Sequence, residues 1–183
     1  MSQAMRHVLG GGIRRWSAAT YGAFFVLFAL PFATLYAACS HERLDTVNGY
    51  QTLAQHDYSY QAADGSTKII TVGSDGFSWI TIAFVAVAIV ISLLGFRTIW
   101  LSVISVASVF TLFLAVAAAG GSKATSEIEI GYWLSSVGLA LAPAADVRPW
   151  RRAALVAAAT LAASAAFIGA VIGLIVLIAR ASG

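Results

Sequence analysis

Five long stretches of this chain contain no charged residue, and they constrain its fold more than any other feature. They cover residues 21–38, 77–96, 98–119, 130–145 and 153–179. A helix needs about 20 apolar residues to cross the hydrocarbon core of a membrane. The first three stretches meet this length, the fourth is short, and the fifth is long enough to require a tilt. We therefore expect an all-α fold, a bundle of five transmembrane helices that forms one membrane domain over residues 1–183.

The composition excludes an ordinary soluble domain. Hydrophobic residues make up 60% of the 183 residues and charged residues only 10%, against about 25% charged residues in a typical soluble domain. The formal net charge of +3 comes from basic residues that are scattered between the apolar stretches. A nucleic-acid-binding face would need them clustered, so no nucleic-acid partner is expected. The preference for Arg over Lys and the many Ala residues suggest a high-G+C bacterial genome, and hence the lipid bilayer of a bacterial plasma membrane.

The positions of Lys and Arg predict the orientation, because short cytoplasmic segments retain basic residues. With five crossings, one side carries Arg6, Arg14, Arg15, Arg97, Arg148, Arg151 and Arg152. The other side carries every acidic residue except Asp146. This places the N-terminus in the cytoplasm, and the loop 40–76 and the C-terminus outside. It also requires residues 130–145 to cross, since otherwise the basic cluster that follows them would lie outside.

The tryptophans support the same topology, because their rings prefer the level of the lipid headgroups. All five lie at the edge of an apolar stretch: Trp16, Trp79, Trp100, Trp133 and Trp150.

A signal peptide is the alternative interpretation of the first apolar stretch. Small residues before Cys39 are typical of a signal peptide, but the apolar core exceeds the usual length of about 7–15 residues. We therefore favour a retained first span.

Pro31 lies inside this stretch and removes a backbone hydrogen bond, so we expect a kink in the helix near Leu27 to Pro31.

The loop 40–76 is the largest polar segment. Residues 58–61 and 67–72 are strand-like and flank Asp64 and Gly65, which predicts a small outer β-hairpin. An isolated hairpin is marginally stable in water, so it should pack on the bundle or on a partner. The candidate partner-binding residues of the hairpin are Tyr58, Tyr60, Asp64 and Gly65.

One part of the chain resembles a known group of sequences. Leu30, Pro31 and Phe32 are followed by Cys39 and then by residues 48–54, Asn-Gly-Tyr-Gln-Thr-Leu-Ala. This pattern is similar to that of uncharacterised actinobacterial membrane proteins, in which a first span ending near Pro-Phe precedes a cysteine and an outer Gly-Tyr-Gln-Leu-Ala segment. Thr52 interrupts the last segment here. The resemblance implies a multi-pass topology and a bacterial source, and it implies no activity.

The apolar stretches argue against chemistry inside the membrane. They contain no Asp, Glu, Lys, Arg or His, whereas proton-coupled transporters and intramembrane enzymes usually keep an ionisable residue there. Outside them, Cys39, His41, Asp45, His56 and Asp57 are capable of binding metal, but their spacing matches no zinc signature. We therefore expect a protein that is not an enzyme and has no cofactor and no metal site.

Two helical patterns suggest how the chain acts. Ser102, Ser105, Ser108 and Thr111 form a hydroxyl stripe, which favours close helix packing and leaves a transport path as the alternative. Small residues recur at every fourth position, as Ala165, Gly169 and Gly173, so another helix can approach closely, within the bundle or in a second protein. Our leading hypothesis is an accessory or scaffold subunit that binds itself or a larger membrane protein. The alternatives are a small transporter or permeability protein, and an outer-loop sensor.

Overall fold

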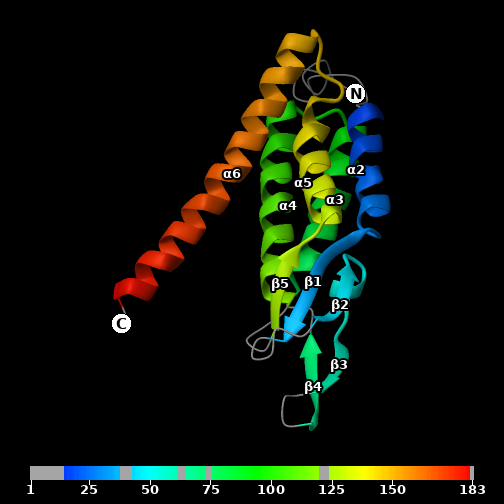
Figure 1. Ribbon diagram of the computed structural model, residues 1–183. Helices are drawn as coiled ribbons and strands as arrows, with labels where there is room; N and C mark the ends of the chain where they lie inside the picture. Colours follow the sequence, from blue (N-terminus) through cyan, green and yellow to red (C-terminus); the bar gives the residue numbers. More distant parts are fainter. Residues whose placement is uncertain (1–14, 38–42, 62–64, 73–75, 120–123, 182–183) are drawn as a thin grey trace.

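The computed structural model describes residues 15–37, 43–61, 65–72, 76–119 and 124–181. Four helices run antiparallel in a bundle, a fifth leans away from it, and the strands lie at one end (Figure 1). The helices are α2 Arg15–Leu27, α3 Phe77–Leu93, α4 Thr98–Ala119, α5 Ile130–Leu141 and α6 Trp150–Ala181, with short 3-10 turns η1 Gln51–Leu53 and η2 Ala142–Ala144. The strands are β1 Pro31–Ala37, β2 Arg43–Asn48, β3 His56–Gln61, β4 Thr67–Val72 and β5 Ala124–Ile128.

Two helices of the described residues, α4 and α6, are long and apolar enough to cross a membrane by length and composition. The segments Phe77–Leu93 and Ile130–Ala144 form shorter apolar helices. The protein is therefore mostly helical, with a small antiparallel sheet beside the helices, and the all-α expectation holds only for the larger part of the chain.

A tight turn at Gly95 reverses the chain between α3 and α4. Gly95 has a φ of 74°, and the amides of Gly95 and Phe96 donate to the carbonyls of Ser92 and Ile91. This is a Schellman motif, which favours glycine because other residues rarely adopt a positive φ. The turn explains how the apolar helices α3 and α4 pack side by side with so short a connection.

The first apolar stretch is not one kinked helix, and this expectation was wrong. Helix α2 ends at Leu27 and strand β1 begins at Pro31. Strand β1 is the central strand of a three-stranded antiparallel sheet, in the order β2-β1-β5. Phe32, Ala33, Thr34 and Leu35 are all buried. A short strand buried on both faces is as continuously apolar as a helix, so hydropathy alone did not separate the two.

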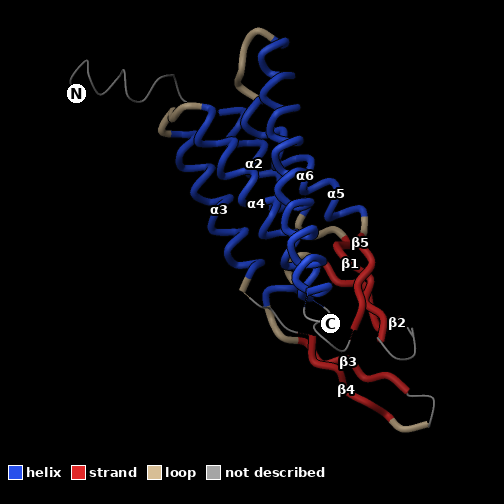
Figure 2. Tube along the Cα trace, turned by 90° about the vertical axis from the view of Figure 1, so that its left-hand side faces the viewer, coloured by secondary structure: helices blue, strands red, loops and turns tan. Residues whose placement is uncertain are grey.

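The predicted hairpin is confirmed. Strands β3 and β4 pair antiparallel, with Tyr58 opposite Ile70 and Tyr60 opposite Lys68. Gly65 follows the tip with a φ of 78°, and residues 62–64, which include Asp64, lie outside the described residues. Figure 2 shows this hairpin beyond the three-stranded sheet, at the end of the molecule far from the start of α2.

Aromatic rings join the bundle to the sheet. The Phe28 ring lies 4.9 Å from that of Phe24, 5.1 Å from that of Phe32 and 5.1 Å from that of Tyr50, measured between ring centroids. Gly49 packs so closely on Phe28 that a Cβ would collide with the ring. Bundle and sheet therefore share one hydrophobic core.

Candidate functional site

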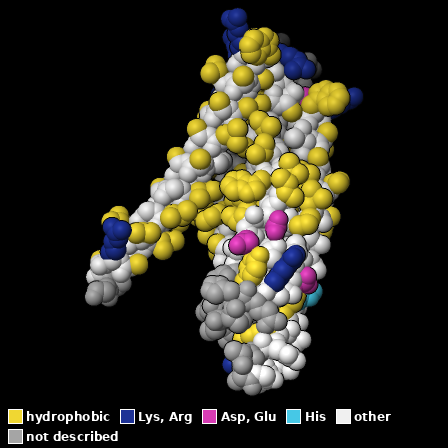
Figure 3. All heavy atoms as spheres, viewed as in Figure 1, with side chains coloured by type: hydrophobic (Ala, Val, Ile, Leu, Met, Phe, Trp, Pro, Cys, Tyr) yellow, Lys and Arg dark blue, Asp and Glu magenta, His cyan; other side chains and the backbone are white. Residues whose placement is uncertain are grey.

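The bundle buries hydroxyl side chains beside its hydrophobic core and exposes large apolar side chains. Hydroxyl side chains from every helix are buried, namely Ser17, Ser78, Thr81, Ser92, Ser105, Ser108, Thr111, Ser135, Ser136, Thr160 and Ser164. Large apolar side chains are exposed on α3 to α6, and Figure 3 shows apolar side chains over the face formed by α4, α5 and α6. Exposed apolar surface of this extent marks contact with lipid or protein, and small hydroxyl residues are typical of contacts between membrane helices.

The hydroxyl stripe of α4 is used in helix packing. Ser105 and Tyr21 of α2 share a hydrogen bond of 2.7 Å, and Thr111 and Thr81 of α3 share one of 2.8 Å. Ser102 accepts a bond of 3.2 Å from Thr160 of α6. Ser108 donates to the Ile104 carbonyl of its own helix. The stripe thus connects α4 to three neighbouring helices, which agrees with the favoured interpretation of the sequence.

The two ends of the bundle differ in charge. The end where α2, α4 and α6 begin carries Arg15, Arg97, Arg148, Arg151 and Arg152. The opposite end, with the strands, carries Arg43, Asp45, Asp57, Lys68, Glu127 and Glu129. Each of the five tryptophans lies in the first turn of a helix, and all are more than half exposed.

Asp146 is the one acidic residue at the basic end among those described. Its carboxylate accepts hydrogen bonds from the amides of Ser17, at 2.7 Å, and of Trp16, at 3.3 Å. A carboxylate at a helix N-terminus satisfies unpaired N–H groups and interacts favourably with the helix dipole. The sequence marked Asp146 only as an exception to the charge pattern. The structure gives it a function, because it connects the segment after α5 to the start of α2.

Helix α6 contacts the bundle along its first half. Besides the bond between Thr160 and Ser102, the Phe167 ring packs edge-on against Phe110, with 4.7 Å between centroids. Ile168 is the last of its side chains that packs on the core. Figure 1 shows the following part of the helix pointing away from the bundle. Its large apolar side chains there are exposed, among them Ile172, Leu174, Ile175, Val176 and Leu177.

The small residues predicted for helix packing have different surroundings. Ala165 lines a cavity of about 140 Å³ between α4, α5 and α6. Gly169 and Gly173 have no heavy atom within 4 Å of the position where a Cβ would lie. Close packing at these two glycines is therefore not made within the described part of the chain.

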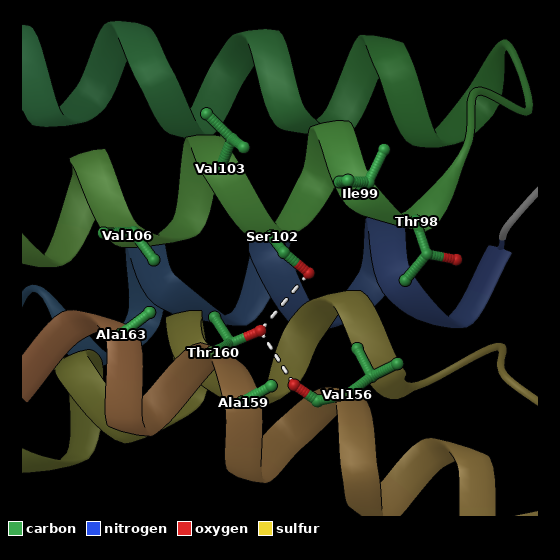
Figure 4. Close-up of a pocket in the computed structure, with 9 residues that line it drawn as sticks. All are labelled: Thr98, Ile99, Ser102, Val103, Val106, Val156, Ala159, Thr160 and Ala163. Atoms are coloured by element: carbon green, nitrogen blue, oxygen red, sulfur yellow. Dashed lines mark hydrogen bonds between the residues drawn. The ribbon is translucent and has the colours of Figure 1, made fainter.

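A groove of about 580 Å³ lies between α4 and the first half of α6. It is lined by Thr98, Ile99, Ser102, Val103, Val106, Val156, Ala159, Thr160 and Ala163 (Figure 4). In this view Ser102 and Thr160 point toward each other across the groove. No local sequence pattern indicates the groove, because its lining is divided between two helices that are far apart along the chain.

The candidate residues of the hairpin are partly used within the molecule. Tyr58 and Tyr60 are half-buried and pack against the hydrophobic core. Burial raises the pKa of the Tyr58 hydroxyl above its ordinary value, and the charge of Asp45 raises it further. Gly65 is exposed. On the opposite face Ile69 is 65% exposed, and the sequence analysis did not single this residue out.

The metal-capable residues do not form a site in the described part of the chain. Cys39 and His41 lie outside the described residues. Within them, no group of three His, Cys, Asp or Glu side chains is placed to hold a metal ion.

No family model, no curated protein and no solved structure matches this chain. Its function is therefore inferred from its own geometry.

Proposed function

We propose that this chain is a multi-pass protein of the bacterial plasma membrane that acts as a non-enzymatic accessory or scaffold subunit. It binds a larger membrane protein or a second copy of itself through α6 beyond Ile168. The observation that carries the proposal is the exposure of this part of α6. It is apolar on its whole circumference, and two of its glycines leave room for another helix.

The proposal includes five crossings, with the basic end of the bundle in the cytoplasm. The burial of hydroxyl groups beneath an apolar surface supports it. So does the placement of five arginines and one carboxylate at one end, against four carboxylates and the basic residues Arg43 and Lys68 at the other. The first crossing is centred on α2, nearer the N-terminus than residues 21–38, because β1 belongs to the sheet at the outer end.

A transport path along α4 is not part of the proposal. Ser105 and Ser108 are fully buried, and their hydroxyls are bonded to Tyr21 and to the Ile104 carbonyl. These contacts favour packing over conduction.

Co-purification in mild detergent tests the partner surface. The Gly169→Leu and Gly173→Leu double variant should lose its partner or its second copy, because the leucines fill the space needed for close approach. Ala162→Leu is the matched control, since Ala162 is exposed on the half of α6 that stays with the bundle. A wild-type protein that is monomeric and has no partner in its native membrane would refute the proposal.

A further inference from the structure

We propose that the groove between α4 and α6 binds one anionic phospholipid of the cytoplasmic leaflet. Its acyl chain lies along the groove and its phosphate lies at the basic end. The inference rests on the membrane placement proposed above, and it is independent of what binds to the second half of α6.

The lining of the groove suits an acyl chain. Ile99, Val103 and Val106 form the wall on α4, and Val156, Ala159 and Ala163 form the wall on α6. The two alanines leave the space open because their side chains are short. An apolar wall on the outside of a membrane protein faces lipid, so an acyl chain enters the groove without removing any charged group from water.

The hydroxyls of the groove do not require a polar ligand. Thr160 Oγ1 lies 3.2 Å from Ser102 Oγ and 2.9 Å from the Val156 carbonyl oxygen (Figure 4). The Thr160 hydroxyl is thus bonded within the protein, and apart from Ser102 and Thr98 the other lining side chains are apolar. The groove therefore selects for hydrocarbon, and selection for a headgroup must come from its end.

Both walls of the groove lead to an arginine at the basic end. On α6, Arg152 precedes Val156 by four residues, so it lies on the same face one turn nearer the helix start. On the other wall, Arg97 directly precedes Thr98, which lines the groove. Both arginines are exposed. Arginine pairs readily with phosphate, through two parallel hydrogen bonds.

The positive charge of this end is not neutralised within the described residues. Asp146, the one acid there, accepts its hydrogen bonds from the start of α2. No described carboxylate forms an ion pair with Arg97 or Arg152. The guanidinium of Arg151 lies 5.7 Å from the centre of the Trp150 ring. A headgroup phosphate supplies the missing negative charge.

This charge also favours lipid over a second copy of the chain. Two copies with the same orientation in a membrane are related by a two-fold axis along the membrane normal, so a dimer through the groove would place the arginines of both copies at the same level. Like charges in contact are unfavourable. An anionic lipid meets the same surface with the opposite charge.

Native mass spectrometry of the full chain in a non-ionic detergent tests the headgroup. Phosphatidylglycerol should be retained over phosphatidylcholine of the same chain length. Arg152→Gln and Arg97→Gln should each lower retention about fivefold, the effect of one basic residue near an anionic lipid surface. Arg180→Gln, at the other end of α6, is the matched control and should change nothing. Equal retention of both lipids, or full retention by the Arg152→Gln variant, would overturn the proposal.

A second pair of variants tests the groove itself. Ala159→Leu fills the groove and should abolish retention of phosphatidylglycerol, whereas Ala162→Leu lies outside it and should not. Thermal melting confirms that each variant is folded. If Ala159→Leu does not fold, the surface variant Arg152→Gln still decides the test. Conversion of a wild-type dimer to a monomer by Ala159→Leu, with lipid retention unchanged, would show that a second copy occupies the groove.

The lipid measurement separates the two proposals. It uses the purified chain alone, so a missing partner does not affect it. If the chain is not recovered in the membrane fraction, the proposed function fails first. If it is recovered there and binds its partner but retains no phosphatidylglycerol, only the lipid inference fails.

Discussion

Helices α4 and α6 are the two longest apolar helices among the described residues, and they are used in opposite ways. In the apolar 18-residue segment of α4, 44% of the residues are buried, whereas in the corresponding segment of α6 only 6% are buried. Helix α4 lies in the centre of the bundle and bonds to α2, α3 and α6 through its hydroxyls. Helix α6 has hydroxyls only in its first half, at Thr160 and Ser164, and this is the half that stays with the bundle.

The difference shows that hydropathy alone does not decide where an apolar helix packs. In lipid, apolar side chains gain little by contacting each other, so packing depends on small residues and interhelical hydrogen bonds. Helix α4 has both, and its partners are present. The second half of α6 has only the small residues, and it is here that we propose contact with a partner.

The largest effect on stability is expected from a bulky residue inside α4. Ser105 is fully buried against Tyr21, so Ser105→Leu should lower the free energy of unfolding by about 1 to 3 kcal/mol through overpacking. The thermal unfolding midpoint in detergent measures it. The matched variant Ala170→Leu, on the exposed part of α6, should leave the midpoint unchanged. An equal loss in both variants would abolish the distinction between the two helices.

Removal of the Asp146 carboxylate should have the next largest effect. Asp146→Ala leaves two amides at the start of α2 without their acceptor, which should cost about 1 kcal/mol. Arg148→Gln, two residues away and exposed, is the control in the same unfolding experiment. A neutral Asp146→Ala variant would show that this contact does not hold α2 in place.

The hydrogen bond between Thr81 and Thr111 should contribute less. A double-mutant cycle with Thr81→Val and Thr111→Val isolates the pair from the other bonds of each threonine. We expect a coupling energy of about 0.6 kcal/mol, the average for hydrogen bonds between membrane helices. Strictly additive single variants would mean that α3 and α4 are held by shape alone.

The smallest effect on stability is expected on α6. Gly173→Leu places its side chain in open space and should change the free energy of unfolding by less than about 0.5 kcal/mol. The same variant should nevertheless weaken partner binding in co-purification. A strong destabilisation of the isolated chain would show that α6 packs on its own bundle.

The sequence predicted the hairpin and the apolar segments, because each is marked by a local pattern. Strand-like runs on either side of Asp64 and Gly65 predicted the hairpin, and four of the five runs without charge coincide with helices α3 to α6. It also predicted that the stripe from Ser102 to Thr111 would serve packing. These features depend on residues that are near one another along the chain.

The strand β1 and the groove depend on distant residues and were missed. Strand β1 is paired with Ala124–Ile128, and no local pattern in either segment announces the other. Pro31 cannot lie inside an undistorted helix, so the sequence analysis predicted a kink there. The end of a helix avoids the same conflict, and this is what the structure has. The hydrogen bond from the Ser17 amide to the Asp146 carboxylate likewise joins two residues that are 129 positions apart.

The most direct test of the account is the accessibility of the two ends of the bundle in intact cells. In a Cys39→Ser background, Ser59→Cys places a thiol on the exposed face of the hairpin and Arg148→Cys places one at the basic end. A membrane-impermeant maleimide should label the first variant in intact cells and the second only after lysis. Labelling of both variants in intact cells, or of neither until lysis, would contradict a bundle that crosses the membrane.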